Sequence, residues 1–144
     1  MTMQKFILAA ATAALLAACA SEPAPPPATT PEPTYLPYEQ FKQLVNSAYK
    51  ADEYITREAA FAELLARDDL RQDDRAETYL MRGLIRGIYV NDGPFASPYC
   101  AVEDYARFEA LASPDHPRMK QMLDDRAYQT SRYQYFDEPA SCGD

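Results

Sequence analysis

Histidine and tryptophan are almost missing from this sequence, whose 144 residues include one His, no Trp, three Cys and four Gly. A single imidazole and no Cys pair at ligand spacing leave no framework for the usual zinc sites. Basic residues are also few, with 14 Lys and Arg against 22 Asp and Glu. Because phosphate binding needs clustered Lys and Arg, this balance excludes a nucleic-acid-binding surface, and the length fits one domain.

Catalytic motifs are also missing, since the sequence contains no G-x-S-x-G elbow, Walker loop, H-E-x-x-H or G-x-G-x-x-G. The only imidazole, His116, stands between Asp115 and Pro117, and we interpret it as a solvated loop residue rather than a general base. Adjacent acidic residues offer carboxylates for glycoside hydrolysis or a divalent ion, but such pairs usually act as helix caps and solvating charge. These pairs are Asp68-Asp69, Asp73-Asp74 and Asp124-Asp125. We therefore predict no enzyme activity, no cofactor and no bound metal.

The first residues have the pattern of an export signal. Lys5 precedes an apolar run from Phe6 to Leu16, which is followed by the small residues Ala17 and Ala18. This run of 11 residues is shorter than the roughly 20 residues that a helix needs to cross the hydrocarbon core of a membrane. The leader, residues 1–18, therefore predicts an export signal rather than a permanent membrane span.

The four residues Leu16-Ala17-Ala18-Cys19 resemble the lipobox of bacterial lipoproteins. The resemblance implies cleavage just before Cys19 and a diacylglyceryl group on its sulfur, and two or more acyl chains give stable attachment. A plain secreted protein with an accidental Cys is the alternative. Ala20 is not the Asp that the family associates with inner-membrane retention. The resemblance thus favours an outer-membrane anchor facing the periplasm over the inner membrane or the cell surface.

A proline-rich segment follows Cys19. Residues 20–37 hold seven prolines and no apolar period, which predicts an extended tether of about 3.1 Å per residue. A ligand for an aromatic-lined groove is the less favoured interpretation. Beyond the leader, the chain has 13 basic and 22 acidic residues. This net negative charge keeps a tethered domain soluble and would also complement a basic partner. We expect the tether at 19–37 and the folded domain at 38–144.

Apolar residues recur at helical spacing from residue 38 onward, and no stretch alternates with period two. We predict an all-α domain of about five helices, at about 38–50, 52–68 and 73–89, then between Pro98 and Ser113, and finally from Pro117 to about residue 135. Asp73 is the expected N-cap of the third helix. The small residues Gly83 and Gly87 on that helix predict close packing of a neighbouring helix, because glycine weakens an isolated helix.

Residues 76–83 (AETYLMRG) and 101–108 (AVEDYARF), with Pro114 after them, resemble the two helices of a tetratricopeptide repeat. Residues 38–70 look like a degenerate copy of the same hairpin. The resemblance implies a short stack of antiparallel helical hairpins. Arg86 stands where the motif usually has an aromatic residue, and the turn from Tyr89 to Cys100 is about six residues longer than the 34-residue unit permits. A generic five-helix bundle remains the alternative.

Two cysteines remain once Cys19 is assigned to the lipid. In an oxidising compartment Cys100 and Cys142 should pair and fasten the C-terminal tail to the long turn before the fourth helix. A redox-active pair is the alternative, which the missing C-x-x-C spacing disfavours.

One helical face predicts recognition of a partner. Tyr79, Arg82, Arg86 and Tyr89 lie at i, i+3, i+7 and i+10 of the third helix, and Tyr and Arg are enriched at binding hot spots. Two arginines on a repeat hairpin suit an acidic motif or a C-terminal carboxylate. The alternative is that these arginines pair with acidic residues of neighbouring helices while the tyrosines pack.

The combined interpretation is a membrane-anchored periplasmic lipoprotein that acts as an adaptor for an envelope protein or peptide. A structural envelope lipoprotein without a dedicated ligand is the alternative. An enzyme acting on envelope carbohydrate is a remote one, because catalytic side chains are scarce.

Overall fold

The computed structural model describes residues 32–143, which form helices joined by short connections and no strand. The expected lipidation site Cys19, the leader and most of the tether lie outside the described residues. The described helices are α1 (Tyr38–Lys50), α2 (Tyr54–Leu65), α3 (Gln72–Ile88), α4 (Pro98–Leu111) and α5 (Met119–Ser131), followed by the 3-10 turn η1 (Tyr133–Tyr135). The prediction of an all-α domain of five helices is confirmed.

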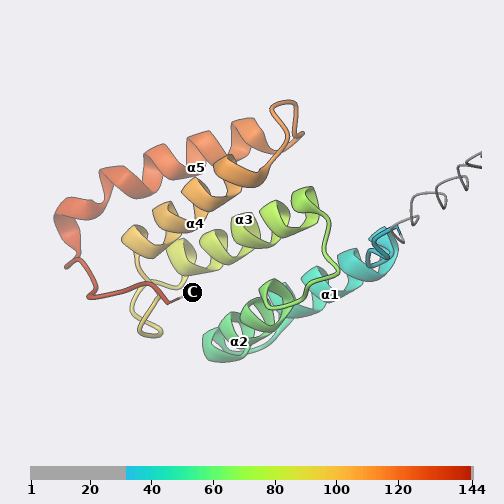
Figure 1. Ribbon diagram of the computed structural model, residues 1–144. Helices are drawn as coiled ribbons and strands as arrows, with labels where there is room; N and C mark the ends of the chain where they lie inside the picture. Colours follow the sequence, from blue (N-terminus) through green and yellow to red (C-terminus); the bar gives the residue numbers. More distant parts are fainter. Residues whose placement is uncertain (1–31, 144) are drawn as a thin grey trace, which may run out of the picture. The chain divides into compact units, whose positions relative to one another are not determined.

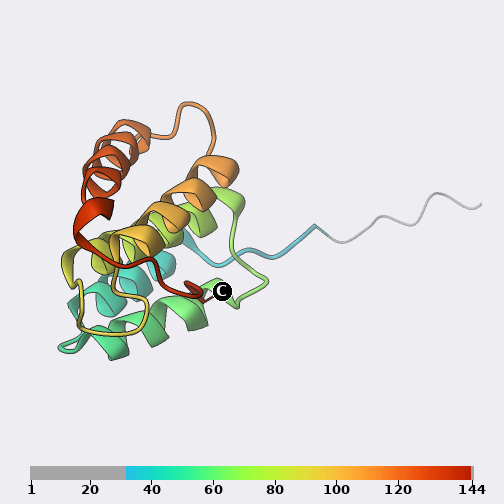
Figure 2. The same cartoon turned by 90° about the vertical axis from the view of Figure 1, so that its left-hand side faces the viewer.

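Successive helices pack in antiparallel fashion (Figure 1). The α1–α2 hairpin and the α3–α4 hairpin lie side by side, and α5 folds back along α4 (Figures 1 and 2). Helix α3 lies between the first hairpin and the α4–α5 pair, so it packs on more than one side. This position explains why nine of its residues are buried, more than a single amphipathic stripe would supply.

The domain has two apolar clusters, one on each side of α3. The first joins α1, α2 and the end of α3, and it includes Phe41, Val45, Phe61, Leu64 and Ile85. The second joins α3, α4 and α5, and it includes Ala76, Leu80, Tyr105, Phe108 and Met122. Burial of each large apolar side chain contributes about 1.5–3 kcal/mol, so both clusters hold α3 in place.

The ends of the helices differ in part from expectation. Ser97 caps α4, since its side chain accepts a hydrogen bond from the Cys100 amide and Pro98 occupies the first turn. Asn91 lies in the connection between α3 and α4. Its φ of 75° is a left-handed conformation that Asn tolerates. The expected N-cap at Asp73 is wrong. Helix α3 begins at Gln72, so Arg71 occupies the cap position, and its side chain makes no capping hydrogen bond.

Helix α5 is shorter than expected. It begins at Met119 and ends at Ser131, and the residues Tyr133–Tyr135 form a 3-10 turn instead of continuing the helix. Pro117 precedes the helix by two residues and lies in the turn from α4 to α5. Two tight turns therefore replace the ends of the long helix that apolar spacing suggested.

The glycines of α3 permit close helix packing, as their positions predicted. A Cβ on Gly83 would lie 2.7 Å from Cε1 of the Tyr105 ring and 3.2 Å from the carbonyl oxygen of Ala101. A Cβ on Gly87 would collide with the Gln129 side chain of α5. Gly83 thus allows α4 to approach the backbone of α3 closely, and Gly87 leaves room for the Gln129 side chain.

Leu36, in the segment that the proline content assigns to the tether, packs against the helices. Leu36 is only 4% exposed and belongs to the first apolar cluster, and its amide donates to the carbonyl oxygen of Asp69 at 2.8 Å. The proline-rich composition predicted a tether up to residue 37. Composition alone does not reveal that Leu36 packs into the first apolar cluster.

Candidate functional site

The predicted recognition face of α3 is turned into the protein at its two arginines. Arg82 is fully buried and Arg86 is 1% exposed. Arg82 donates to Asp104 from Nε at 3.0 Å and from Nη2 at 2.7 Å. Arg86 donates from Nε to both Glu58 oxygens at 3.1 Å, and its Nη1 lies 3.1 Å from Asp104 Oδ2.

The alternative, in which Arg82 and Arg86 pair with acidic residues of neighbouring helices, describes their contacts. Buried charges need partners because their desolvation is costly, and α2 and α4 supply those partners. Tyr79 and Tyr89 are half-buried. The centroid of the Tyr79 ring lies 5.3 Å from the guanidinium carbon of Arg82. The Tyr89 hydroxyl accepts a hydrogen bond from Arg57 at 2.6 Å.

Arg82, Arg86, Glu58 and Asp104 form a buried charge cluster that links three helices. Burial raises the pKa of the Asp104 carboxyl, and the nearby Arg82, Arg86 and Arg107 oppose that rise. Burial also lowers the pKa of Arg86, but the carboxylates of Glu58 and Asp104 outweigh it and leave the pKa above its ordinary value. The cluster joins α2, α3 and α4 between the two apolar clusters.

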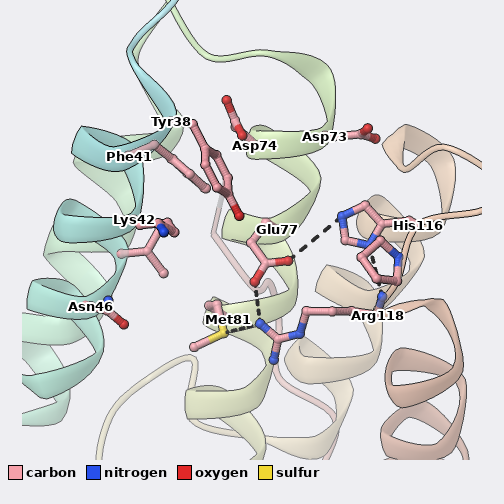
Figure 3. Close-up of a pocket in the computed structure, with 12 residues that line it drawn as sticks. Tyr38, Phe41, Lys42, Asn46, Asp73, Asp74, Glu77, Met81, His116 and Arg118 are labelled. Atoms are coloured by element: carbon pink, nitrogen blue, oxygen red, sulfur yellow. Dashed lines mark hydrogen bonds and ion pairs between the residues drawn. The ribbon is translucent and has the colours of Figure 1, made fainter.

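An open cleft of about 320 Å³ lies instead between α1, the first half of α3 and the α4–α5 turn. We call it the α1–α3 cleft, and Figure 3 shows its lining residues. Phe41, Val45 and Met81 give it an apolar wall. Charged and polar side chains share the same lining, namely Lys42, Asn46, Asp73, Asp74, Glu77, His116 and Arg118. Mixed lining of this kind is typical of ligand sites, in which a few polar groups orient a bound molecule.

Glu77 lies at the centre of the α1–α3 cleft (Figure 3). Its carboxylate accepts a hydrogen bond from Arg118 in the turn before α5, and its Oε2 lies 3.9 Å from His116 Nε2. The same Arg118 guanidinium also contacts the sulfur of Met81 at 3.2 Å. One carboxylate therefore joins α3 to the α4–α5 turn.

His116 is not the solvated residue that its loop position suggested. Its side chain is only 9% exposed, and its ring meets Phe108 edge-on at 5.0 Å between ring centroids. Its Nδ1 accepts a hydrogen bond from the Arg118 amide at 3.2 Å. The imidazole thus supports the turn that closes one end of the cleft.

Asp73 fastens the end of α4 to the start of α3. Its Oδ1 accepts hydrogen bonds of 2.9 Å from both the amide and the hydroxyl of Ser113. The Ser113 amide, followed by its hydroxyl, lowers the pKa of Asp73 below its ordinary value. The acidic residue that sequence assigned to a helix cap thus stabilises a contact between two helices.

Asp74 differs from its neighbours because one of its oxygens has no partner. The residue is 5% exposed, and Oδ2 is buried without a hydrogen bond among the described residues. Burial raises the pKa of Asp74 in spite of the charge and the backbone amide of Arg71. An unsatisfied buried carboxylate oxygen costs free energy, so its place in the lining of an open cleft marks a point where a donor would bind favourably.

The other acidic pairs serve local contacts. Asp69 accepts two hydrogen bonds from Arg67 at 2.8 and 2.7 Å. Asp124 accepts one from Lys120 at 2.5 Å on the exposed face of α5. Within residues 32–143, no group of three or more His, Cys, Asp or Glu side chains is placed to hold a metal ion.

Cys100 and Cys142 form the predicted disulfide bond. Cys100 lies in the first turn of α4 rather than in the turn before it, and it is fully buried. Tyr99 and Tyr133 stack beside it with ring centroids 4.0 Å apart. The bond and the stacked rings fasten the segment after α5 to the beginning of α4 (Figure 2).

The comparisons with known proteins add no relative. No protein-family model, no curated protein sequence and no solved structure matches this chain. Among the helices described here, none combines the length and the apolar character that a membrane crossing requires.

The α1–α3 cleft was not foreseen from the sequence. Asp74, Glu77 and Met81 do follow helical spacing on α3, but the same spacing is typical of the border between a buried and a solvated face. Arg118 and His116 come from a turn some forty positions away, and nothing local in the chain predicts that they reach Glu77. The helix spacing alone was therefore a signal, but an ambiguous one.

Proposed function

We propose that this protein is a lipid-anchored lipoprotein of the bacterial envelope whose helical domain binds a protein or peptide partner in the α1–α3 cleft. The observation that carries the binding part is the cleft itself. It combines an apolar wall with an unsatisfied buried carboxylate oxygen on Asp74. Such a site favours recognition of a segment that brings both an apolar side chain and a hydrogen-bond donor.

The anchoring part rests on the sequence. The lipobox-like residues 16–19 and the proline-rich tether support lipidation at Cys19 and a domain held away from the membrane. Ala20 supports the outer membrane, with the domain facing the periplasm. No catalysis is part of the proposal, because Lys42, Asp73 and Arg118 are held by Glu39, Ser113 and Glu77 rather than grouped around a nucleophile.

The domain is proposed to be a short tetratricopeptide-like stack. Two antiparallel hairpins followed by a single helix support this likeness, as does the close contact of Gly83 with Ala101 and Tyr105 across the second hairpin. Helix α3 packs on both α1 and α4, the arrangement expected where the first helices of successive hairpins adjoin.

Anchoring is tested by metabolic labelling with radioactive palmitate and by membrane fractionation. The parent should incorporate label and sediment with outer membranes, whereas Cys19→Ser should do neither. Label in the Cys19→Ser variant would contradict the lipobox assignment.

Binding is tested separately by crosslinking in intact cells and identification of captured proteins. Asn46→Arg places a long side chain at the exposed α1 side of the cleft, and Gln43→Arg places the same side chain on an exposed part of α1 outside the cleft lining. A defined partner captured by the parent and by Gln43→Arg, and lost in Asn46→Arg, is expected. Equal capture by all three proteins, or by none, would contradict binding in this cleft and leave a structural lipoprotein.

A further inference from the structure

The charged groups around the α1–α3 cleft are almost all engaged. Lys42 lies 2.9 Å from Glu39 Oε1 and above the Tyr38 ring, 5.1 Å from its centroid. Arg118 binds Glu77, which also has His116 nearby. The two cationic side chains that line the cleft thus have acidic partners.

The carboxylate of Asp74 is the exception within the described lining. Its Oδ2 accepts no hydrogen bond from residues 32–143, although Asp74 is only 5% exposed. In Figure 3 the carboxylate lies at the end of the cleft where α3 begins, beyond Tyr38 and away from Arg118. A carboxylate in this state accepts hydrogen bonds only, so the group that completes it must be a donor.

A cationic donor fits this end of the cleft best. A hydrogen bond to an ionised group is stronger than one between neutral groups, and the domain as a whole is acidic, with a net charge of −8 for the chain. The apolar side chains of Phe41, Val45 and Met81 line the same cleft as the Asp74 carboxylate. Lysine and arginine side chains pair a charged tip with an apolar stem, which suits a carboxylate at the end of an apolar wall.

We propose that the α1–α3 cleft recognises a basic side chain of a peptide segment, with Asp74 Oδ2 accepting a hydrogen bond from its ammonium or guanidinium group. This inference rests on the proposed function and names the partner chemistry of the same site. Asp73 and Glu77 stay bound to Ser113 and Arg118 and surround the bound cation with negative charge.

The probes are two capped peptides, acetyl-Leu-Lys-Leu-amide and the same peptide with norleucine in place of Lys. Norleucine keeps the apolar stem and removes the ammonium group. Binding to the isotopically labelled full chain in detergent micelles is followed by the amide signals of residues in α3. Because a charge-assisted hydrogen bond is worth more than a neutral contact, the Lys peptide should bind about tenfold more tightly than the norleucine peptide.

Asp74→Asn is the decisive variant, because it keeps the shape and removes the charge. It should bind both peptides with equal affinity, at the level of the norleucine peptide, and melt no lower than the parent. Asp68→Asn, an exposed acid outside the cleft lining, should retain the preference for Lys. Asp74→Ala removes both the charge and the acceptor oxygens, and it is the second variant if Asp74→Asn fails to fold.

The outcomes separate this inference from the proposed function. Equal binding of both peptides by the parent, or an unchanged preference in Asp74→Asn and Asp74→Ala, would overturn the role of Asp74 and leave a peptide-binding cleft. Binding of neither peptide would overturn the inference, whereas the capture of a partner in cells tests the cleft without regard to charge.

Discussion

Arg82 and Asp104 face each other across the α3–α4 hairpin as a two-bond ion pair in which neither side chain is exposed. The bonds measure 3.0 Å from Nε to Oδ2 and 2.7 Å from Nη2 to Oδ1. Asp104 also lies 3.1 Å from Arg86 Nη1. A planar guanidinium presents two parallel donors to a carboxylate, so this pair fixes the register of α4 against α3.

Removal of one partner from this pair should be strongly destabilising. Arg82→Ala leaves Asp104 buried without its two hydrogen bonds from Arg82, and we expect a loss of about 3–5 kcal/mol in the free energy of unfolding, measured by chemical denaturation. Lys120→Ala, which breaks an exposed ion pair with Asp124, should change the same quantity by less than about 1 kcal/mol. Similar losses in the two variants would contradict a structural role for the buried pair.

The burial of Arg82 and Arg86 decides which variants can test partner binding. An Arg82→Ala, Arg86→Ala double variant is an obvious choice if the two arginines are taken as a recognition face, but both side chains are buried. Such a variant should lose its partner because it unfolds. Exposed positions at the rim of the α1–α3 cleft avoid this confusion.

Gly83→Ala should lower stability although alanine is the better helix former. The new methyl group would lie 2.7 Å from the Tyr105 ring and 3.2 Å from the Ala101 carbonyl oxygen, which belongs to the backbone of α4. Overpacking costs about 1–3 kcal/mol, against a gain of about 1 kcal/mol in helix propensity. A reduced melting temperature is expected. Ser47→Ala, at an exposed helical position, should leave it unchanged or raised, and a stabilised Gly83→Ala would show that α3 and α4 do not approach this closely.

Loss of the disulfide should also destabilise the domain. Cys100 and Cys142 are 42 positions apart in sequence, and on the loop-entropy model the bond stabilises by about 4 kcal/mol. Cys142→Ser should lower the melting temperature and add one thiol that a thiol reagent detects after denaturation, and chemical reduction of the parent should produce the same shift in melting temperature. An unchanged melting temperature would exclude a structural bond.

Asp73 should make the domain sensitive to acid. Its pKa is lowered in the folded state, chiefly by the Ser113 amide, so its contribution is present above the unfolded pKa of about 3.9 and is lost as the pH falls through the lower, folded value. Asp73→Asn should therefore flatten the fall in unfolding free energy below about pH 4. Asp74 and Asp125 have raised pKa values and act with the opposite sign, since protonation in the folded state favours folding. An unchanged acid slope in Asp73→Asn would contradict the contact with Ser113.

The sequence predicted the helices well because their apolar spacing is strong. The first helix was expected at residues 38–50 and is observed at Tyr38–Lys50. Ser97 and Pro98 predicted the start of α4, and Cys100 and Cys142 predicted their own pairing. These features depend on local chemistry, or on the scarcity of cysteine.

The candidate site could not be predicted in the same way. Arg82 and Arg86 share a helix face with two tyrosines, and only the packing of α2 and α4 reveals that this face is buried against Glu58 and Asp104. Likewise, the sequence predicts a cap at Asp73 and does not reveal its contact with Ser113, 40 positions away. Long-range pairing decides both cases, and spacing along one helix does not encode it.

Site-specific photocrosslinking shows whether a partner binds in the α1–α3 cleft. A photoreactive phenylalanine analogue placed at Asn46, at the cleft, and at Gln43, on an exposed part of the same helix outside the cleft lining, is irradiated in intact cells. We expect one defined crosslinked partner from position 46 and none from position 43, with a lower yield of the product when Asp74→Asn is added. Crosslinking from position 43 with equal yield, or from neither position, would contradict binding in the cleft.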